Sequence, residues 1–525
     1  MGESTARRLK LAPKIGRADT LLVVLGDQLG RRAPILRTLD RSRDAVVMFE
    51  VTREAEHVPS HVQRTVLFLS AMRHFAADLM KSGFRVHYVA LDEQLNTHAI
   101  DTELERALSK IQPVRVAVTR PGEHRVDKMI REVCQRHNTH LDVHPDASFT
   151  CSLDDFDRWA DGRSNLVMEH FYRWRRRALD IMVKNDKPAG GQWNFDEENR
   201  HSFKSAPSVP APYRPRMDTV TRDVIELVKR RFPNAPGRID HFRWPVTPDQ
   251  ARRGLRDFVA KRLEHFGTYE DAMWTGEPVL FHSMLSPSLN LKLIPPIECV
   301  RAAADAYGEG RVALNNVEGF VRQIIGWREF VRGVYYREGP DYPNRNGLGQ
   351  KGKLPVFYWT GDTDMTCLRY CIGDVLDNAY SHHIPRLMVV GNFALIAGVR
   401  PRAVHEWFLG MYADAVEWVT APNVVGMSQH ADHGIVATKP YAASGSYINR
   451  MSNYCEKCRY DVGTRTGDGA CPFNTFYWDF LLRHRKRFAK NRRMLLVMGH
   501  VKRLSPGDRR AIQRHAATLR DKFGI

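Results

Sequence analysis

Over the first 150 residues, short apolar runs alternate with amphipathic segments. Four runs are typical of buried strands, at residues 21–25 (LLVVL), 45–51 (AVVMFEV), 84–91 (FRVHYVAL) and 114–119 (VRVAVT). Between the second and third runs, residues 63–80 carry apolar side chains at helical spacing. This alternation predicts an α/β domain built on a parallel sheet with helices on both faces. Ligands of such sheets bind beyond the carboxyl ends of the strands, which directs attention to Asp27 after the first run.

Beyond this region the pattern changes twice. Residues 184–250 are polar and punctuated by proline and glycine, which indicates a long surface connector. After the connector the pattern is helical almost to the end of the chain, as in Phe320, Ile324, Trp327, Val331 and Val334, which share one helix face. We therefore expect an α/β domain at 18–150, a connector at 151–250 and a large all-α domain at 251–525.

Charge adds a partner class. The chain has 79 basic and 60 acidic residues and a net charge of +19, which favours a polyanionic partner, most simply nucleic acid. An acidic membrane or ribosome surface stays open on charge alone. The sequence predicts no membrane span, and the first fourteen residues lack the apolar stretch of a secretory signal, so we expect a cytoplasmic protein.

The cysteines divide into two groups. Cys134, Cys151 and Cys299 are scattered, as buried core thiols are. Cys455-x-x-Cys458 is followed by Cys471-Pro472, a spacing that allows three thiolates to converge on one metal centre. The fourth ligand would be Cys367 or Cys371, four residues apart on an expected helix. Spacing alone leaves an iron–sulfur cluster, a zinc ion and unligated thiols all open.

Two segments of the helical half resemble the flavin-binding segments of photolyases and cryptochromes, whose domain layout also matches. The first, residues 266–296, has a Tyr and then an HS-x-LSP turn, and the second is the helix around WREF at 315–336. A hydroxyl beside free amides at a helix start suits a phosphate. An ordinary core helix with solvated Arg328 and Glu329 is the alternative. By resemblance the residues that contact FAD are Tyr269, His282, Ser283, Leu285 and Ser286.

A third segment, residues 382–423, resembles the region that surrounds the flavin ring in the same superfamily. The resemblance implies that Arg386 pairs with Asp414 beside the flavin and that Thr420 faces flavin N5. Iron–sulfur relatives carry an acid at the position of Thr420. This departure puts the protonation and redox behaviour of the flavin in question, but not flavin binding.

Taken together, residues from about 20 to 500 resemble the iron–sulfur bacterial cryptochromes and photolyases, which act as prokaryotic (6-4) photolyases. The resemblance implies a structural [4Fe-4S] cluster on Cys367, Cys455, Cys458 and Cys471, with Cys371 as a bystander. It also implies a 6,7-dimethyl-8-ribityllumazine antenna held at Asp27 and Glu54. Relatives have a Tyr where His57 stands, so antenna affinity is expected to differ.

The implied activity is light-dependent repair of (6-4) photoproducts in UV-damaged DNA by electron transfer from excited reduced FAD, performed by a monomer. The lesion is flipped into a pocket above the flavin. His383 would be the acid/base residue, with His382 beside it and Tyr441 against the lesion. Trp407, Trp359 and Tyr447 would relay electrons to the flavin, and Phe408 replaces a Tyr of relatives. A His pair that only caps a helix, and Trp residues that only fill the core, are the simpler alternatives.

Two rival functions stay open at this point. One is a blue-light photoreceptor cryptochrome with the same cofactors and little repair activity. The other is a zinc-bearing nucleic-acid-binding module without catalysis.

Overall fold

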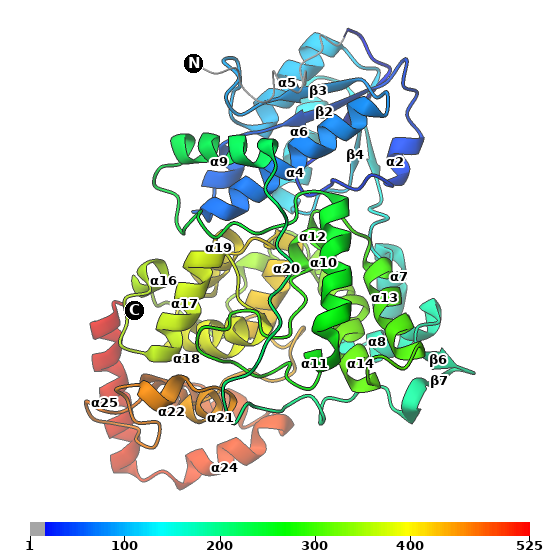
Figure 1. Ribbon diagram of the computed structural model, residues 1–525. Helices are drawn as coiled ribbons and strands as arrows, with labels where there is room; N and C mark the ends of the chain where they lie inside the picture. Colours follow the sequence, from blue (N-terminus) through cyan, green and yellow to red (C-terminus); the bar gives the residue numbers. More distant parts are fainter. Residues whose placement is uncertain (1–15) are drawn as a thin grey trace.

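The computed structural model describes residues 16–525, and the first fifteen residues, with the expectation about a secretory signal, lie outside it. An α/β domain sits at one end of the molecule, above a larger helical body (Figure 1). Its five strands form one parallel sheet in the order β3-β2-β1-β4-β5. The strands are β1 (Thr20–Val23), β2 (Ala45–Phe49), β3 (Val86–Val89), β4 (Arg115–Thr119) and β5 (His140–His144).

Successive side chains of each strand enter two different cores. Leu22 and Val46 pack on the face that α4 covers, whereas Leu21 and Val47 pack beneath α5 and α6. The predicted two-sided sheet is therefore confirmed, because a strand buried on both faces reads as a continuous apolar run. The helices of this domain are α2 (Pro34–Arg37), α3 (Arg53–Glu56), α4 (Val62–Lys81), α5 (Ile100–Ile111) and α6 (His124–Arg136).

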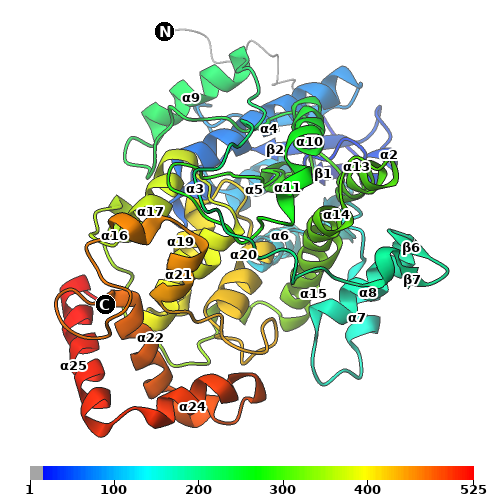
Figure 2. The same ribbon diagram turned by 60° about the horizontal axis from the view of Figure 1, so that its bottom comes forward.

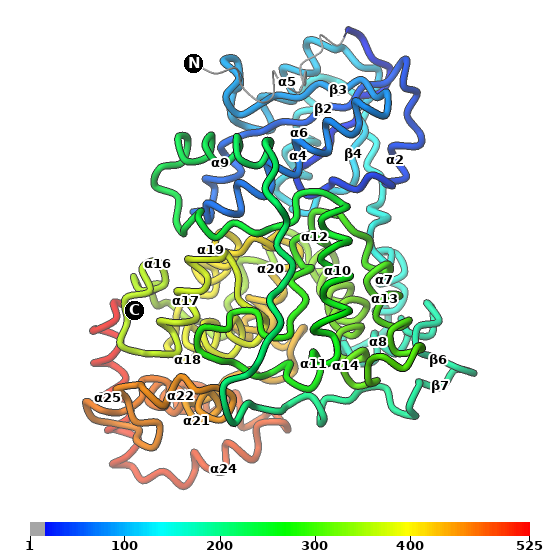
Figure 3. The backbone as a smooth tube through the Cα atoms, viewed as in Figure 1, coloured from blue at the N-terminus to red at the C-terminus, as the bar shows by residue number. Residues whose placement is uncertain are grey.

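The range 151–250, expected as a connector, contains helices as well as irregular chain. Its elements are α7 (Leu153–Ala160), α8 (Met168–Leu179), the hairpin β6 (Val183–Lys184) and β7 (Lys187–Pro188), η1 (Ala189–Gly191), α9 (Thr219–Arg231) and the start of α10 (Pro248–Lys261). Helices α7 and α8 pack on the helical body, and α9 packs on α4. Residues 192–218, which lead from η1 to α9, carry no helix or strand and cross the surface of the helical body (Figure 3).

The remainder is helical, as predicted. Figure 2 shows its last helices, α24 and α25, at the edge farthest from the α/β domain. None of the described helices is long and apolar enough to cross a bilayer. Its elements are α11 (Leu263–Phe266), α12 (Ser286–Asn290), α13 (Pro296–Gly308), α14 (Leu314–Val321), η2 (Arg322–Arg328), α15 (Glu329–Glu338), η3 (Tyr342–Asn344), α16 (Phe357–Thr360), α17 (Thr366–Asn378), η4 (Pro385–Gly391), α18 (Asn392–Ala397), α19 (Pro401–Met411), α20 (Glu417–Ala421), η5 (Pro422–Ser428), α21 (Gly445–Met451), η6 (Tyr454–Lys457), α22 (Pro472–Arg483), α23 (Arg485–Phe488), η7 (Arg492–Met494), α24 (Leu495–Arg503) and α25 (Pro506–Phe523).

Three of these elements, η2, η4 and η5, are π-helical turns inside longer helices. The helix expected at 315–336 is therefore α14, η2 and α15 in continuous succession. Arg328 and Glu329 at its centre are 8% and 2% exposed, so the alternative of a solvated pair on an ordinary helix is wrong. Such turns shift the side-chain register and occur frequently at functional sites.

The start of α4 ties the two halves together. The Nδ1 atom of His61 accepts a hydrogen bond from the amide of Gln63 at 3.1 Å and so caps α4. The other ring nitrogen lies 2.9 Å from the carbonyl oxygen of Leu376. The Gln63 side chain donates to the carbonyl oxygen of Asp377 at 2.7 Å. The start of α4, in the α/β domain, is thus hydrogen-bonded to the end of α17, in the helical body.

Candidate functional site

An ion pair lies between η4 and the turn that precedes α20. Arg386 binds Asp414 through two parallel contacts of 2.9 and 3.1 Å. The Ser286 hydroxyl donates to the same carboxylate at 2.6 Å, and the Asn290 side chain donates to the Asp414 carbonyl oxygen at 2.7 Å. Helix α12, with its LSP sequence, therefore holds the pair expected at the flavin edge. The hydroxyl of Ser286 is engaged here and supports Asp414.

Three histidines gather beside this pair. The rings of His282 and His382 are stacked, with centroids 4.2 Å apart. His282 Nε2 and His382 Nδ1 are buried and have no hydrogen-bond partner among the described residues. Burial and the charges of His383 and Arg386 lower the pKa of His282 to about 3. Burial, followed by His282, His383 and Arg386, lowers the pKa of His382 well below its usual range.

His383 differs from its neighbours because its side chain is exposed. Surrounding protein and the charge of Arg386 nevertheless lower its pKa to about 4. His383 is therefore neutral near pH 7 and accessible to a ligand, so it can accept a proton but would donate one only after its pKa is raised.

The other expected contact residues lie on several elements of the helical half. Thr420 is 7% exposed on α20. Tyr269 stacks on Phe203 with centroids 4.4 Å apart, and the Leu285 amide donates to the Ser283 hydroxyl at 3.4 Å. Tyr441 and Tyr447 are half-buried, and burial raises the pKa of both phenols.

A set of aromatic rings leads from Arg386 into the helical core. Tyr412 lies under the Arg386 guanidinium at 4.1 Å, and its ring centroid is 5.8 Å from that of Trp407. Trp407 is 1% exposed, and its Nε1 donates to the Tyr358 carbonyl oxygen at 3.0 Å. Trp359 follows Tyr358 in the chain and is half-buried. Trp407 is thus bonded to the backbone of the residue that precedes Trp359, and Tyr412, which the sequence did not single out, lies between Trp407 and Arg386.

The four expected ligand cysteines come from α17 and from the segment 455–471, and all lie in one core with Cys371. Burial, followed by Cys471, Cys371, Cys455 and Cys458, raises the pKa of Cys367 well above its usual range. Within residues 16–525 no three His, Cys, Asp or Glu side chains converge tightly enough for a single metal ion.

Cys371 has a partner of its own. Its Sγ donates to the Tyr454 hydroxyl at 3.9 Å. Burial and Asp374 raise its pKa, and Cys371 in turn contributes to the raised pKa of Cys367. As expected, Cys134, Cys151 and Cys299 are buried; Cys134 and Cys299 lie in two other cores, whereas Cys151 lies in the same large core as this group.

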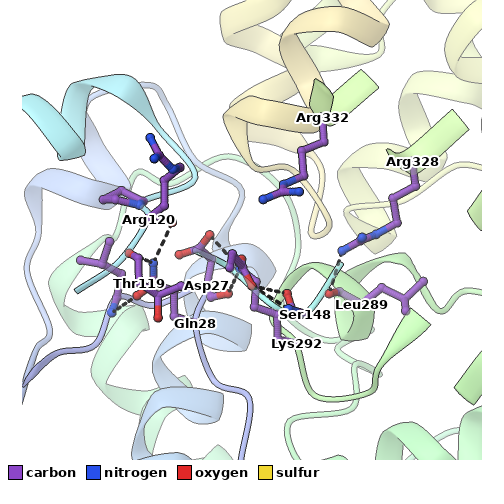
Figure 4. A network of polar contacts seen from close by, with 12 residues as sticks. Asp27, Gln28, Thr119, Arg120, Ser148, Leu289, Lys292, Arg328 and Arg332 are labelled. Atoms are coloured by element: carbon purple, nitrogen blue, oxygen red, sulfur yellow. Dashed lines mark hydrogen bonds and ion pairs between the residues drawn. The ribbon is translucent and has the colours of Figure 1, made fainter. Parts of the chain in front are cut away.

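The expected antenna residues lie at the carboxyl edge of the parallel sheet. Asp27 follows β1, and the ammonium group of Lys292 donates to its backbone oxygen at 2.7 Å and lies 3.4 Å from its carboxylate (Figure 4). Asp146 follows β5 and lies 3.3 Å from the same ammonium group. Burial alone would raise the pKa of Asp146, but Lys292, Arg332 and the hydrogen bonds from Ser148 lower this pKa below its usual value.

Glu54, the second expected antenna residue, is also paired. Arg125 binds both its oxygens, at 3.0 and 2.6 Å, and reaches Glu123 at 2.9 Å. Burial and Arg125 lower the pKa of the neighbouring His57 to about 4. Sequence reasoning missed Lys292, Arg125 and Glu123. The last two follow the fourth predicted strand, so their place at the sheet edge was a usable signal.

These groups fit the expected cofactors in different ways. The unpartnered nitrogens of His282 and His382 beside the Arg386–Asp414 pair suit a polar ring such as a flavin. The four neighbouring thiols suit an iron–sulfur cluster. The edge at Asp27 and Glu54 suits a polar aromatic ligand, although its charges are already paired.

Comparison with known proteins identifies the class first. A family model described as deoxyribodipyrimidine photo-lyase-related protein matches residues 22–244. A crystal structure of a class III photolyase from Agrobacterium tumefaciens covers 98% of this chain and 99% of its own, with a TM-score of 0.55 at 15% identity. A Synechocystis cryptochrome covers 84% of this chain and 89% of its own, with a TM-score of 0.53 at 12% identity. The fold is that of photolyases and cryptochromes.

The family follows from sequence. A (6-4) photolyase of Agrobacterium fabrum is 44% identical over 505 residues, which cover 96% of this chain and 99% of that protein. The chain therefore belongs to the bacterial (6-4) photolyase family of enzymes.

Proposed function

We propose that this protein repairs (6-4) photoproducts in UV-damaged DNA with light, using bound FAD, a structural [4Fe-4S] cluster and a ribityllumazine antenna. The observation that carries the proposal is the exposed His383 beside the Arg386–Asp414 pair, in a chain of this family. The FAD, when bound and reduced, supplies the electron for the reaction. The positive net charge of +19 suits the DNA partner.

The residues of this chain would hold the flavin from several elements. Arg386 and Asp414, which Ser286 and Asn290 hold in place, give the flavin edge a fixed donor and acceptor. The buried nitrogens of the His282–His382 stack would donate to or accept from the same ligand. The residues proposed to contact FAD are Tyr269, His282, Ser283, Leu285, Ser286, Arg386, Asp414 and Thr420.

His383 is proposed as the proton carrier for the lesion. A pKa of about 4 keeps its ring neutral before DNA binds. Negative charge on DNA phosphates or on the lesion favours the protonated ring and raises this pKa. The proton would pass from a ring nitrogen to the lesion and return when the lesion is resolved. His382 would support the neighbouring ring, and Tyr441 would contact the flipped bases.

The proposed cluster ligands are Cys367, Cys455, Cys458 and Cys471, as the family resemblance implies, and the hydrogen bond of Cys371 to Tyr454 supports leaving Cys371 out. The cluster would join α17 to the segment 455–471. Trp407 and Trp359 are proposed to relay electrons to the flavin, with Tyr447 as a further station. The direct contact of Trp407 with the chain at Tyr358 supports this route.

A repair assay tests the proposal. The purified protein is illuminated with a duplex that contains one (6-4) photoproduct, and restored bases are counted by chromatography. We expect light-dependent repair, together with an absorption spectrum that shows flavin and an iron–sulfur shoulder. A coloured protein that repairs nothing under reducing conditions would contradict the proposal.

The second candidate, a blue-light photoreceptor, is favoured by the fold shared with a cryptochrome. It predicts light-induced change of the flavin with little repair. The repair assay therefore separates the two functions. A zinc-bearing module without catalysis has no support from the family to which the chain belongs.

A further inference from the structure

Two leucines at the start of α24 are exposed to solvent. Leu495 is 57% exposed and Leu496 is 82% exposed, which makes Leu496 the most exposed large apolar side chain that the structure describes. Within residues 16–525, the other exposed side chains of this kind are isolated along the chain. The helix itself is well packed, because Met498 and Val501 on its other face are buried in the main core. A single exposed Leu needs no explanation, but an adjacent pair on a packed helix indicates an interaction surface.

The surroundings of the two leucines are strongly basic. Residues 483–503 contain nine Lys or Arg and no Asp or Glu. The cations nearest to the pair in sequence are all exposed, namely Arg492, Arg493, Lys502 and Arg503. Such a surface suits a polyanion. Apolar side chains flanked by cations are typical of proteins that insert a wedge between the bases of duplex DNA.

The start of α24 is bonded to the segment that leads to Tyr441. The Asn491 side chain donates to the Thr438 carbonyl oxygen at 2.9 Å, and the Arg493 guanidinium donates to the Thr438 hydroxyl at 2.5 Å. The charge of Arg493 also acts on the Tyr441 phenol, where it opposes the rise in pKa that burial causes. Leu496 lies one helical turn beyond Arg493, so the two side chains are neighbours. The leucine pair therefore lies near the residue that is proposed to contact the flipped bases.

We propose that Leu496, supported by Leu495, is a wedge that enters the base stack of damaged duplex DNA where the lesion is flipped out. Flipping leaves a gap between the faces of the neighbouring bases, and an apolar side chain in that gap holds the duplex open. The flanking cations hold the phosphates on either side. The inference rests on the proposed function, because the lesion is the substrate of that function. Leu496 acts on binding of the duplex and takes no part in the chemistry of the lesion.

The sharpest test is Leu496→Gln, which keeps a side chain of similar length and removes its apolar character. Leu95→Gln is the matched control, since Leu95 is 72% exposed and lies in the α/β domain. Each purified flavoprotein is titrated with the same (6-4) lesion in a duplex and in a single strand. Affinity is measured by fluorescence anisotropy, and opening of the duplex by the fluorescence of 2-aminopurine placed next to the bases opposite the lesion.

We expect Leu496→Gln to weaken binding of the duplex about tenfold and to lower the 2-aminopurine signal, because the opened stack loses the side chain that fills it. Affinity for the single strand should be unchanged, since it has no duplex to open. Arg492→Gln should weaken binding of both forms alike, as loss of a phosphate contact does. Leu95→Gln should bind both forms as the wild-type protein does.

Wild-type affinity and a wild-type 2-aminopurine signal in Leu496→Gln on the duplex would overturn the wedge and leave the proposed function intact. An equal loss of affinity for duplex and single strand would also overturn it, because Leu496 would then be a general contact. A defect found only in binding to phosphatidylglycerol vesicles would assign this face of α24 to a membrane and overturn the wedge. Failure of the wild-type protein to bind (6-4) DNA in either form would contradict the proposed function and, with it, the wedge.

Discussion

The two expected chromophore sites of this protein are built on opposite principles. At the edge of the sheet, Asp27, Asp146 and Glu54 already have cationic partners in Lys292 and Arg125. In the helical half, the ring nitrogens of His282 and His382 are buried without partners, and four thiols lie close together. At the sheet edge the polar groups are therefore paired within the protein, whereas in the helical half polar groups are left for a ligand to pair with.

This difference has an energetic meaning. A buried polar group without a partner lowers the stability of the folded protein by about 1–3 kcal/mol, and a ligand that forms a hydrogen bond with that group recovers this stability. A group that is already paired gives a ligand less to gain. We therefore expect the flavin and the cluster to be required for stability, and the antenna to be dispensable and more easily lost.

The largest effect should follow from the cluster. Cys367→Ser, Cys455→Ser, Cys458→Ser and Cys471→Ser should each abolish bound iron and leave little soluble protein, because the proposed cluster would join distant segments. Iron is measured by colorimetric assay against protein concentration. Cys371→Ser, a buried neighbour bonded to Tyr454, is the control and should keep its iron. Loss of iron in Cys371→Ser would show that the fourth ligand has been chosen wrongly.

The next effect should be on catalysis alone. His383→Ala removes the exposed ring and leaves the buried His282–His382 stack in place. We expect repair of the (6-4) lesion to fall on the order of a hundredfold or more, while flavin, iron and affinity for damaged DNA are unchanged. Repair is followed by chromatography and affinity by fluorescence anisotropy. Parallel loss of affinity would make His383 a binding residue, and unchanged repair would direct attention to His382.

A smaller effect concerns the supply of electrons. Trp407→Phe and Trp359→Phe should each lose most of the rate of flavin photoreduction, because the indole is easier to oxidise than a phenyl ring. Flavin content should be unchanged, since neither residue is expected to contact it. The rate is measured by flavin absorbance under blue light. Trp244→Phe, which changes a buried Trp in the other core, is the control. Normal rates in both relay variants would place the route elsewhere.

The smallest effect is on stability and pH. His405 is 1% exposed, and burial, followed by Arg402 and His57, lowers its pKa to about 3. The unfolded chain binds this proton near pH 6.5 and the folded protein does not, so the free energy of unfolding falls as pH drops from about 6.5 towards 3. The slope from one such group is at most about 1.4 kcal/mol per pH unit. His405→Gln should flatten the curve from urea titrations, and the exposed His500→Gln should not.

Much of the fold could be predicted from the sequence because apolar periodicity reports burial directly. The four predicted strands overlap β1 to β4, and α4 lies within a residue of its expected range. Strand β5, with the sequence HLDVH, was missed because its side chains are half-buried at the sheet edge and carry charge. The π-helical turns were missed too, since a pattern spaced by three and four residues does not reveal an inserted residue.

The candidate site shows the same limit. Arg386 and Asp414 were expected to pair from resemblance, and the structure contains that pair. The contacts of Lys292 with Asp27 join residues 265 positions apart, and no local pattern predicts them. The contact of Tyr412 with Arg386 likewise depends on how η4 and α19 pack, which side-chain spacing does not specify.

The cap of α4 has a consequence for synthesis. The ring of His61 is bonded to the carbonyl oxygen of Leu376, a residue that leaves the ribosome 315 positions later. At ~5–20 residues per second that interval is about 15 to 60 s. During this time the ring nitrogen of His61 that bonds to Leu376 has no protein partner. We therefore expect the nascent α/β domain to depend on chaperones until α17 has emerged.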